Sequence, residues 1–438
     1  IPFASESTRE KQQGDTLAQT ASTLSGKNVT LNSQQRDVLI TGSAVTGSNA
    51  VSISANKGNV IVNPGQNHAR HETAGSRSTI GDLGGDGYSG TVGWQSSRYR
   101  SVDDVSQQSA IRSVIQSGDG DIGIAAKEKV VIAGTDVQAG KSLLVRGRDI
   151  TVDPAVDTEH RLREQQSSQY GVTTALSGYA VSALQAVERL SQSVEDKRDP
   201  RLSAIYAAQS ALSLATQTVA SNMNAAAIKV TVSVGGGSSQ SKQQQDAVTR
   251  VGSTLSANSD IRLDAEKDIT LAGANVRGRH IDLNAGHSLT LMSAQSESQL
   301  TGSSSSQHAG VGVGFGLGGQ QNGFTIELSA SGQKGKENGN SQTHQLTHVT
   351  ATESVNLRSG SDTVLDGAVV SGKQVEADVG GDLLISSPQD TSRYDSKTTS
   401  AGLNVSICVP PICGGQAVTG NASLSQQILN DRYASVPE

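Results

Sequence analysis

Residues 261–291, IRLDAEKDITLAGANVRGRHIDLNAGHSLTL, decide the fold class of this chain. Short alternations of apolar and polar residues begin at Ile261 and Ile269, and each returns 20 residues later, at Ile281 and Leu289. Strict alternation predicts strands with one buried face and one solvated face. A pair of such strands cannot bury its apolar face alone, whereas copies stacked coil on coil form a continuous core.

The same pattern occurs in four blocks, which start at Val29, Ile122, Ile261 and Val355. Glycines that follow the second strand of a block mark tight corners. We therefore predict an all-β fold, a right-handed parallel β-helix that spans residues 1–438 as one continuous repeat region with β-hairpin excursions between blocks. A β-sandwich with regular turns is the alternative interpretation.

The amino-acid composition limits the classes of function that the chain can have. Aromatic residues make up 3% and charged residues 17% of the 438 residues, which suits the narrow core of a β-helix and not an enzyme with a large aromatic pocket. The net charge of −6 argues against a nucleic-acid partner, which requires a basic face. No apolar run approaches the ~18 residues of a membrane helix. The opening residues Ile1, Pro2 and Phe3 read as mid-protein sequence, so we expect the chain to be a piece of a longer protein.

One segment departs from the strand pattern. The third block starts 139 residues after the second, whereas the other separations are 93 and 94. Much of the surplus falls in residues 174–223, where apolar residues recur with a helical period and Asp199 and Pro200 resemble a helix start. We predict an inserted α-helical hairpin, which either covers an apolar flank of the solenoid or docks a partner; the first is favoured.

A glycine-rich excursion is predicted at residues 307–331. It contains GVGVGFGLG at 310–318 and predicts a β-hairpin with one apolar face. The hairpin either lies on the solenoid, which is favoured, or contacts a membrane. The candidate membrane-contact residues are Val311, Val313, Phe315, Leu317, Phe324, Ile326 and Leu328.

The two cysteines, Cys408 and Cys413, lie in a short excursion at residues 398–415. In an oxidising compartment they can close a small loop, so a disulfide is favoured over free thiols. A metal site would need more Cys or His nearby.

We predict no catalytic, cofactor-binding or metal-binding residues. Aspartates such as Asp268 and Asp362 lie beside glycines or between strands, where Asp favours turns. His344 and His348 could present two imidazoles, but a third ligand is not evident. A β-helical carbohydrate-active enzyme, which needs an acidic cluster on one outer face, is therefore the least favoured function.

Residues 307–415 resemble the haemagglutinin repeat of the filamentous-haemagglutinin-like exoproteins. The resemblance rests on the glycine-rich hairpin at 310–318 and its Gly-, Lys- and Asn-rich continuation at 332–339. It continues through SGSDTVLDGAVVSG at 359–372, DVGGDLL at 378–384 and QDTSRYDSK at 389–397. The other blocks repeat these features more loosely.

This resemblance implies a filament exported by two-partner secretion through an outer-membrane partner of the producing cell and displayed at the bacterial cell surface. In the contact-dependent growth inhibition members, such repeats precede a C-terminal toxin and are associated with carrying it across the target cell's outer membrane. The leading hypothesis is therefore a non-catalytic delivery module that engages the target outer membrane or a surface receptor. The alternative is an adhesin that binds surface glycans or proteins. Neither hypothesis involves nucleic acid or a small-molecule substrate.

Overall fold

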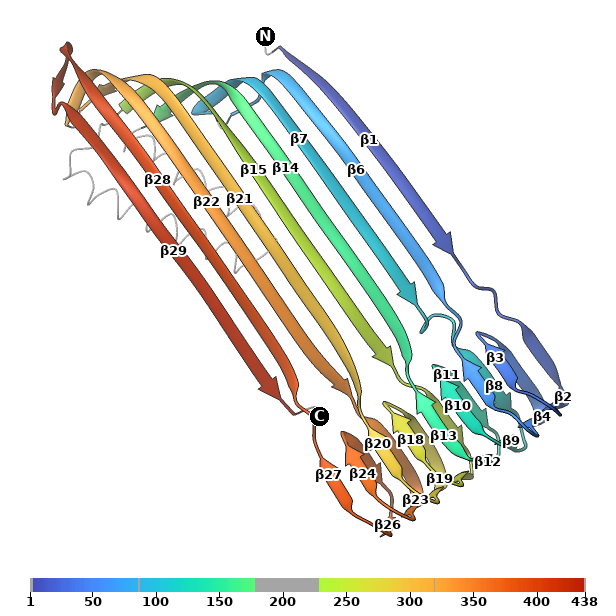
Figure 1. Cartoon of the computed structure of the whole chain (residues 1–438). Coiled ribbons are helices and arrows are strands. Elements are labelled where there is room, and N and C mark those ends of the chain that lie inside the picture. The colour runs from blue at the N-terminus through green and yellow to red at the C-terminus, as the bar shows by residue number, and fades with distance from the viewer. Residues whose placement is uncertain (1–2, 86, 178–227, 319, 437–438) are drawn as a thin grey trace.

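The computed structural model describes residues 3–85, 87–177, 228–318 and 320–436, and within these ranges every regular element is a strand. The all-β class is thus confirmed. Figure 1 shows two parts: a stack of short parallel strands, which we call the coil body, and a fan of long antiparallel strands, which we call the lateral sheet. The first long strand starts at the far end of the lateral sheet, whereas the C-terminus lies near the coil body.

The coil body consists of two parallel sheets between which the chain alternates. The larger sheet contains β2 (Thr23–Ser33), β4 (Ala44–Ala55), β8 (Ser113–Ser117), β9 (Ile122–Ala126), β11 (Thr135–Ala139), β12 (Leu143–Gly147), β16 (Thr254–Ala257), β17 (Asp260–Ala265), β19 (Asn275–Ala285), β23 (Thr347–Ser359), β25 (Ala368–Ser371) and β26 (Gln374–Val379). The smaller sheet contains β3 (Val38–Thr41), β5 (Val60–Asn63), β10 (Lys129–Ala133), β13 (Asp149–Asp153), β18 (Ile269–Ala272), β20 (Leu289–Met292), β24 (Thr363–Asp366) and β27 (Leu383–Ser386).

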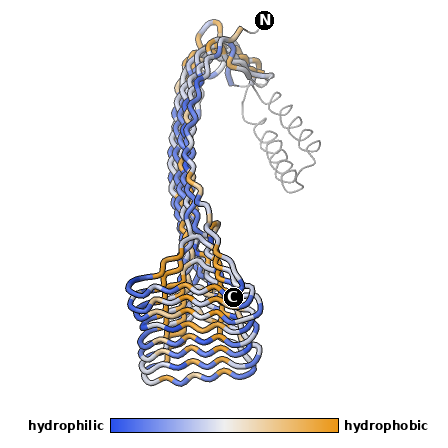
Figure 2. The backbone as a smooth tube through the Cα atoms, turned by 90° about the vertical axis from the view of Figure 1, so that its right-hand side faces the viewer, coloured by the Kyte–Doolittle hydropathy of each residue, from blue (hydrophilic) through white to orange (hydrophobic). Residues whose placement is uncertain are grey.

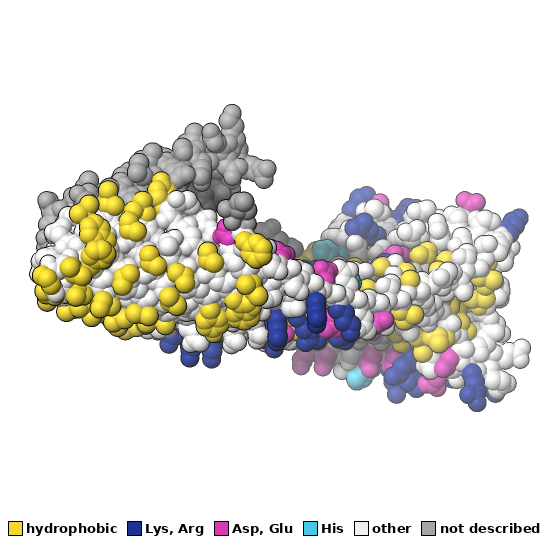
Figure 3. All heavy atoms as spheres, turned by 90° about the horizontal axis from the view of Figure 1, so that it is seen from above, with side chains coloured by type: hydrophobic (Ala, Val, Ile, Leu, Met, Phe, Trp, Pro, Cys, Tyr) yellow, Lys and Arg dark blue, Asp and Glu magenta, His cyan; other side chains and the backbone are white. Residues whose placement is uncertain are grey.

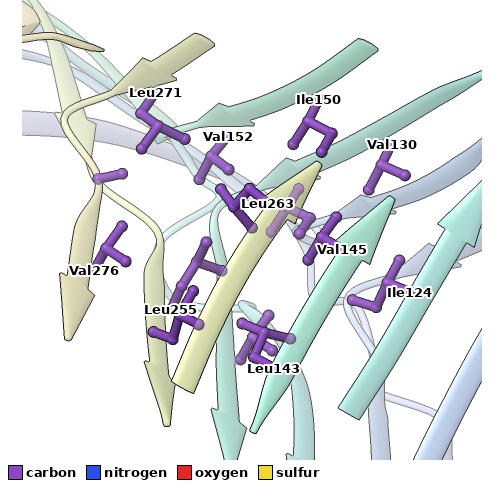
Figure 4. Packing of buried hydrophobic residues seen from close by; sticks show 14 of the residues in the cluster. Ile124, Val130, Leu143, Val145, Ile150, Val152, Leu255, Leu263, Leu271 and Val276 are labelled. Atoms are coloured by element: carbon purple, nitrogen blue, oxygen red, sulfur yellow. The ribbon is translucent and has the colours of Figure 1, made fainter. Parts of the chain in front are cut away.

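The apolar pairs that the 20-residue step predicts lie opposite one another. One ladder of parallel partners runs along the body through Val29, Val51, Ile122, Leu143, Ile261, Ile281, Val355 and Val375. A second ladder runs through Val38, Val60, Val130, Ile150, Ile269, Leu289, Thr363 and Leu383. Figure 2 shows these ladders as apolar columns inside the body, and Figure 4 shows their side chains packed between the sheets. Burial of these columns stabilises the stack.

Alternate coils turn the same corner in two different ways. After β3, β10, β18 and β24 the corner is a single glycine with φ between +49° and +71°, namely Gly42, Gly134, Gly273 or Gly367. After β5, β13, β20 and β27 the chain leaves the body as a long hairpin instead. An ideal Cβ on Gly134 would lie 2.7 Å from Cβ of Ala155, the first residue of the neighbouring hairpin, so the small corner makes room for the hairpin base.

A buried hydroxyl fixes the base of the hairpins where the chain returns to the body. Thr347 Oγ1 accepts a hydrogen bond from the backbone N–H of Ala274, in the glycine corner of the preceding coil, and donates to the carbonyl of Met292, where the chain leaves the body to form the hairpin. Ser113 and Ser253 make the equivalent two bonds at the earlier hairpins. These side chains accept corner N–H groups that the excursion would otherwise leave without a partner, and they add a second hydrogen bond to carbonyls that already accept the N–H of Gly42, Gly134 or Gly273.

Nine long strands form the lateral sheet of the described residues. In spatial order they are β1 (Ala4–Leu17), β6 (Asn67–Asp82), β7 (Ser89–Gln107), β14 (Ala155–Ser177), β15 (Ile228–Val251), β21 (Ala294–Leu317), β22 (Gln321–Gln345), β28 (Asp390–Gly415) and β29 (Val418–Ser435). Stacked coils and neighbouring strands share a spacing of about 4.8 Å. Because a hairpin of two strands leaves the body every two coils, the hairpins align edge to edge without a gap. Figure 2 shows the result as a single layer that rises from the body and bends over at its far end.

Several expectations need correction. Residues 174–177, assigned above to a helical hairpin, instead continue strand β14 and pair with β15, so their side chains alternate between two faces as in any strand. The remainder of the predicted helical hairpin lies outside the described residues. Residues 398–415 are not a separate cysteine loop but the far end of β28. Residues 307–331 are only the far end of the longer hairpin β21–β22. The coils of all four blocks stack in one continuous body, and the predicted hairpin excursions pair with one another in a sheet of their own, which was not predicted from the sequence.

Candidate membrane-contact face

The far end of the lateral sheet carries apolar side chains in register across its strands. Val311 of β21 lies opposite Leu328 of β22 on one side and Val234 of β15 on the other. Residues directly opposite each other in an antiparallel pair share a face, as do residues two apart along a strand. The same rows continue outward to Val172 and Val405. One face of this end of the sheet is therefore apolar from β7 to β28.

We call this surface the apolar face. It consists of Val92, Trp94, Tyr170, Val172, Leu176, Ile228, Val230, Val232, Val234, Val311, Val313, Phe315, Leu317, Phe324, Ile326, Leu328 and Leu403. The seven residues predicted for membrane contact are 40–56% exposed here, and Figure 3 shows many apolar side chains gathered at this end of the molecule, with polar groups and backbone between them. Extended apolar surface of this kind marks an interaction site in soluble and peripheral proteins.

The opposite face of the same strands is polar. Glycines 310, 312, 314 and 316 alternate with the apolar residues of β21 and leave this side of the strand without side chains. Next to them Lys229 of β15 forms an ion pair with Glu327 of β22, with Nζ and Oε1 2.5 Å apart. Ser406 of β28 also donates to Glu327, at 2.9 Å. The sheet is amphipathic across its thickness.

This polar cluster shifts the titration of its carboxylate. Burial by itself would raise the pKa of Glu327, but hydrogen bonds from Lys229, Thr325 and Ser406 outweigh burial and lower the pKa below its usual value of 4.5. Glu327 is thus held in its charged form.

Aromatic side chains define two positions on the apolar face. Phe315 and Phe324 lie opposite each other near the end of the hairpin and pack edge to face, with ring centroids 5.0 Å apart. Trp94 and Tyr170 stack at 5.9 Å nearer the coil body, and the Trp94 indole N–H donates to Ser78. The second pair has apolar rings and polar tips, the composition found where apolar surface meets water.

The structure places all seven predicted hairpin residues together on one surface. The favoured expectation that this hairpin lies on the solenoid is nevertheless wrong, because β21 and β22 pair edge to edge with β15 and β28 and leave their apolar side uncovered by described residues. Its glycines lie on the polar face instead of approaching the coils.

Sequence reasoning missed part of the apolar face. The alternation of Ile228, Val230, Val232 and Val234 has the same period as the predicted hairpin, and this pattern could have identified them as part of the apolar face. Val92 and Val172 carry only a weak local signal, and their register with β15 identifies them.

The cysteines lie at the far end of β28. The Sγ atoms of Cys408 and Cys413 are 2.06 Å apart and form a disulfide, and both residues are buried. Cys408 lies opposite Thr325 and Cys413 opposite Gly323, so the short segment between them bulges out of the pairing with β22.

The aspartates and histidines have structural partners. Asp268 accepts the backbone N–H of Ser288, and Asp362 accepts that of Asp382, so each carboxylate joins a corner to the next coil. His344 bonds Asp390, whereas His348 contacts the carbonyl of Leu346.

Among residues 3–85, 87–177, 228–318 and 320–436, no group of three or more His, Cys, Asp or Glu side chains is placed to hold a metal ion. Within the same ranges, no helix has the length and apolarity needed to cross a membrane.

Comparison with known proteins identifies the repeats. The hemagglutinin repeat family matches residues 4–93, 92–236 and 234–401. The chain belongs to this family. The matches together span the coils and hairpins described above, and they confirm the resemblance to the filamentous-haemagglutinin-like exoproteins.

The relatives are contact-dependent growth inhibition proteins. The chain is 35% identical over 371 residues to a deoxyribonuclease CdiA of Dickeya dadantii, covering 83% of this chain and 11% of that protein. It is 32% identical over 452 residues to a tRNA nuclease CdiA of Escherichia coli, covering 100% of this chain and 14% of that protein. A 16S rRNA endonuclease CdiA of Enterobacter cloacae is 32% identical over 449 residues, covering 100% of this chain and 13% of that protein. The chain thus spans less than one sixth of the length of these relatives.

Proposed function

We propose that this chain is a non-catalytic filament module of an exported protein, and that it supports contact-dependent delivery of a C-terminal toxin by engaging the target cell's outer membrane. The observation that carries the proposal is the exposed apolar face, which runs without interruption from β7 to β28. The relatives named as nucleases are far longer than this chain, so their printed activities do not have to reside in the repeats.

The amphipathic sheet suits the surface of a membrane. Its backbone N–H and C=O groups are paired between neighbouring strands, so contact with lipid leaves few unsatisfied groups away from the sheet edges. The ion pair of Lys229 and Glu327 lies on the other face, which must stay solvated. We infer that the apolar face lies against the membrane while the polar face points away from it.

The coil body supplies a rigid support. We infer that it is a segment of a right-handed parallel β-helix, because crossovers between parallel strands are almost always right-handed. We further propose that the parent protein leaves its cell through an outer-membrane secretion partner and is displayed at the cell surface, as expected for its family.

The alternative is an adhesin that binds surface glycans or proteins. Trp94 and Tyr170 favour it, because they present a stacked, exposed aromatic pair beside polar side chains. An adhesin requires a specific receptor, whereas a lipid-contacting sheet binds vesicles that contain no glycan and no protein.

Flotation with pure phosphatidylcholine vesicles tests the proposal. A variant with Val311→Thr, Val313→Thr, Phe315→Thr and Leu317→Thr keeps residues that favour strands but makes one strand of the face polar. We expect the unmodified chain to float and the variant to lose most of its binding. A matched control, Leu39→Thr with Leu384→Thr, removes exposed apolar residues from the coil body and should float normally.

Failure of the unmodified chain to bind, or equal binding by the fourfold variant, would contradict membrane contact through this face. The delivery role is tested separately by placing the four substitutions in the parent protein on producing cells. We expect unchanged display on the producing cell and loss of growth inhibition in target cells; full inhibition would contradict the role.

A further inference from the structure

A shallow groove lies on the same side of the lateral sheet as the apolar face, closer to the coil body. Its volume is about 540 Å³, and its lining includes Arg98 and Arg100 of β7, Lys242 of β15, and Lys334 and Lys336 of β22. We call it the cationic groove. All five cations are exposed.

Strand register places these side chains in two adjacent rows. The first row runs through Arg98, Gln166, Gln240, Ser305, Lys334 and Thr399. The second row runs through Arg100, Glu164, Lys242, Ser303, Lys336 and Lys397. Arg98 is four residues from Trp94, and Lys334 is six residues from Leu328, so an even spacing puts both on the side of the apolar face.

The groove is only partly neutralised. Arg100 pairs with Glu72 at 2.9 Å, and Lys242 pairs with Glu164 at 3.4 Å. Within the described part of the chain, Arg98, Lys334 and Lys336 have no carboxylate within 4.0 Å. The chain as a whole has a net charge of −6, so this local excess of positive charge is not a general property of its surface.

The order of side chains along the sheet matches a membrane interface. Apolar residues occupy the far end, the Trp94–Tyr170 pair lies at their boundary, and the cations follow roughly 20 Å along the strand from Leu328. Figure 3 shows Lys and Arg side chains gathered between the apolar surface and the coil body. A sheet that lies with its apolar face on lipid turns the groove toward the headgroups.

We propose that the cationic groove binds the phosphate groups of anionic lipid headgroups while the apolar face contacts the acyl chains. The lysine and arginine donors supply charge-assisted hydrogen bonds, and Ser303 and Ser305 add hydroxyl donors at the floor of the groove. This inference rests on the proposed membrane contact and adds a lipid preference to it.

Vesicle flotation with two compositions tests the lipid preference. The chain is floated with phosphatidylcholine vesicles and with vesicles that also contain phosphatidylglycerol. The unmodified chain should prefer the anionic vesicles, and added salt should weaken that preference. A Lys334→Ser, Lys336→Ser variant should bind anionic vesicles roughly thirtyfold more weakly, at about 1 kcal/mol for each lysine near an anionic surface. Its binding to phosphatidylcholine should not change.

Two matched variants isolate the groove. Lys127→Ser with Lys129→Ser removes two exposed lysines, also two residues apart, from the coil body and should bind as the unmodified chain does. Lys334→Arg with Lys336→Arg keeps the charge and should bind normally. Equal binding of the unmodified chain to both vesicles, or an equal loss in the coil-body variant, overturns the lipid preference and leaves the proposed function standing. Binding to neither vesicle overturns the proposed function and this inference with it.

Discussion

The coil body and the lateral sheet use the same alternation of apolar and polar residues with opposite results. Leu263 in the body is fully buried, whereas Leu328 in the sheet is 41% exposed. In the body the chain returns after about 20 residues and covers its own apolar side. In the sheet the strands pair only edge to edge, so no described residue covers the apolar side. Alternation thus predicts a strand. Whether the apolar face of that strand becomes core or contact surface depends on whether a second sheet packs against it.

The largest expected effect separates these two environments directly. Leu263→Ala removes a fully buried side chain and should lower the free energy of unfolding by about 2–5 kcal/mol. Leu328→Ala should cost less than about 1 kcal/mol, because the side chain is already in contact with water. Urea denaturation followed by circular dichroism measures both variants. Equal losses would contradict the assignment of the two leucines to core and surface.

The glycine corners are the next test, because they join the two regions. Gly134→Ala places a Cβ 2.7 Å from Ala155 Cβ at a φ of +49°, so backbone strain and a steric clash both act. We expect a loss of about 1–3 kcal/mol in the free energy of unfolding. Gly123 is the matched control, since a Cβ there meets open space and its φ is not positive. A neutral Gly134→Ala would show that the corner tolerates a side chain.

The hydroxyl at the hairpin base should have a comparable or smaller effect. Thr347→Val keeps the shape but leaves the N–H of Ala274 without its partner and removes one of the two hydrogen bonds to the carbonyl of Met292, at a cost of about 1–3 kcal/mol. Thr350→Val, at an exposed site three residues further along β23, should be close to neutral. Hydrogen exchange at Ala274 sharpens the comparison: faster exchange is expected only in the Thr347 variant, and unchanged exchange would argue against the pairing.

The smallest effect lies on the polar face of the lateral sheet. The pKa of Glu327 is lowered in the folded protein, so its ionised form stabilises the fold above the unfolded pKa near 4.5. That contribution is lost as the pH falls through the lower folded pKa. Glu327→Gln should therefore cost less than about 1 kcal/mol at neutral pH and flatten the acid limb of the stability curve. An acid limb that is identical in the two proteins would contradict this role.

The coils could be predicted from the sequence because their signals are local. Ile261, Ile269, Ile281 and Leu289 fix strand, step and stacking partner within 30 residues, and Gly273 marks the corner between them. The lateral sheet could not be predicted in the same way. Its middle portions, such as Ser303–Ser306, are polar on both faces and carry no hydrophobic period. Their pairing follows from the equal spacing of coils and strands, which is a property of the assembled stack.

The candidate site was predicted only in part, for a related reason. Val311 and Phe315 lie in a strong local alternation, but the face also needs Val92, Val172 and Val234 from other hairpins. The pairing register between distant segments brings these residues together, and that register cannot be predicted from a single sequence. The cationic groove depends on register even more, because its five cations come from three separate hairpins.

The most direct test of the account uses the natural reporter on the apolar face. The chain contains one tryptophan, Trp94, which is 38% exposed at the boundary of that face. Adding vesicles should shift Trp94 emission to shorter wavelength, and brominated lipid chains should quench it, because the indole leaves water for the membrane interface. Emission that stays unchanged and unquenched while the protein floats with the vesicles would show that another surface makes the contact.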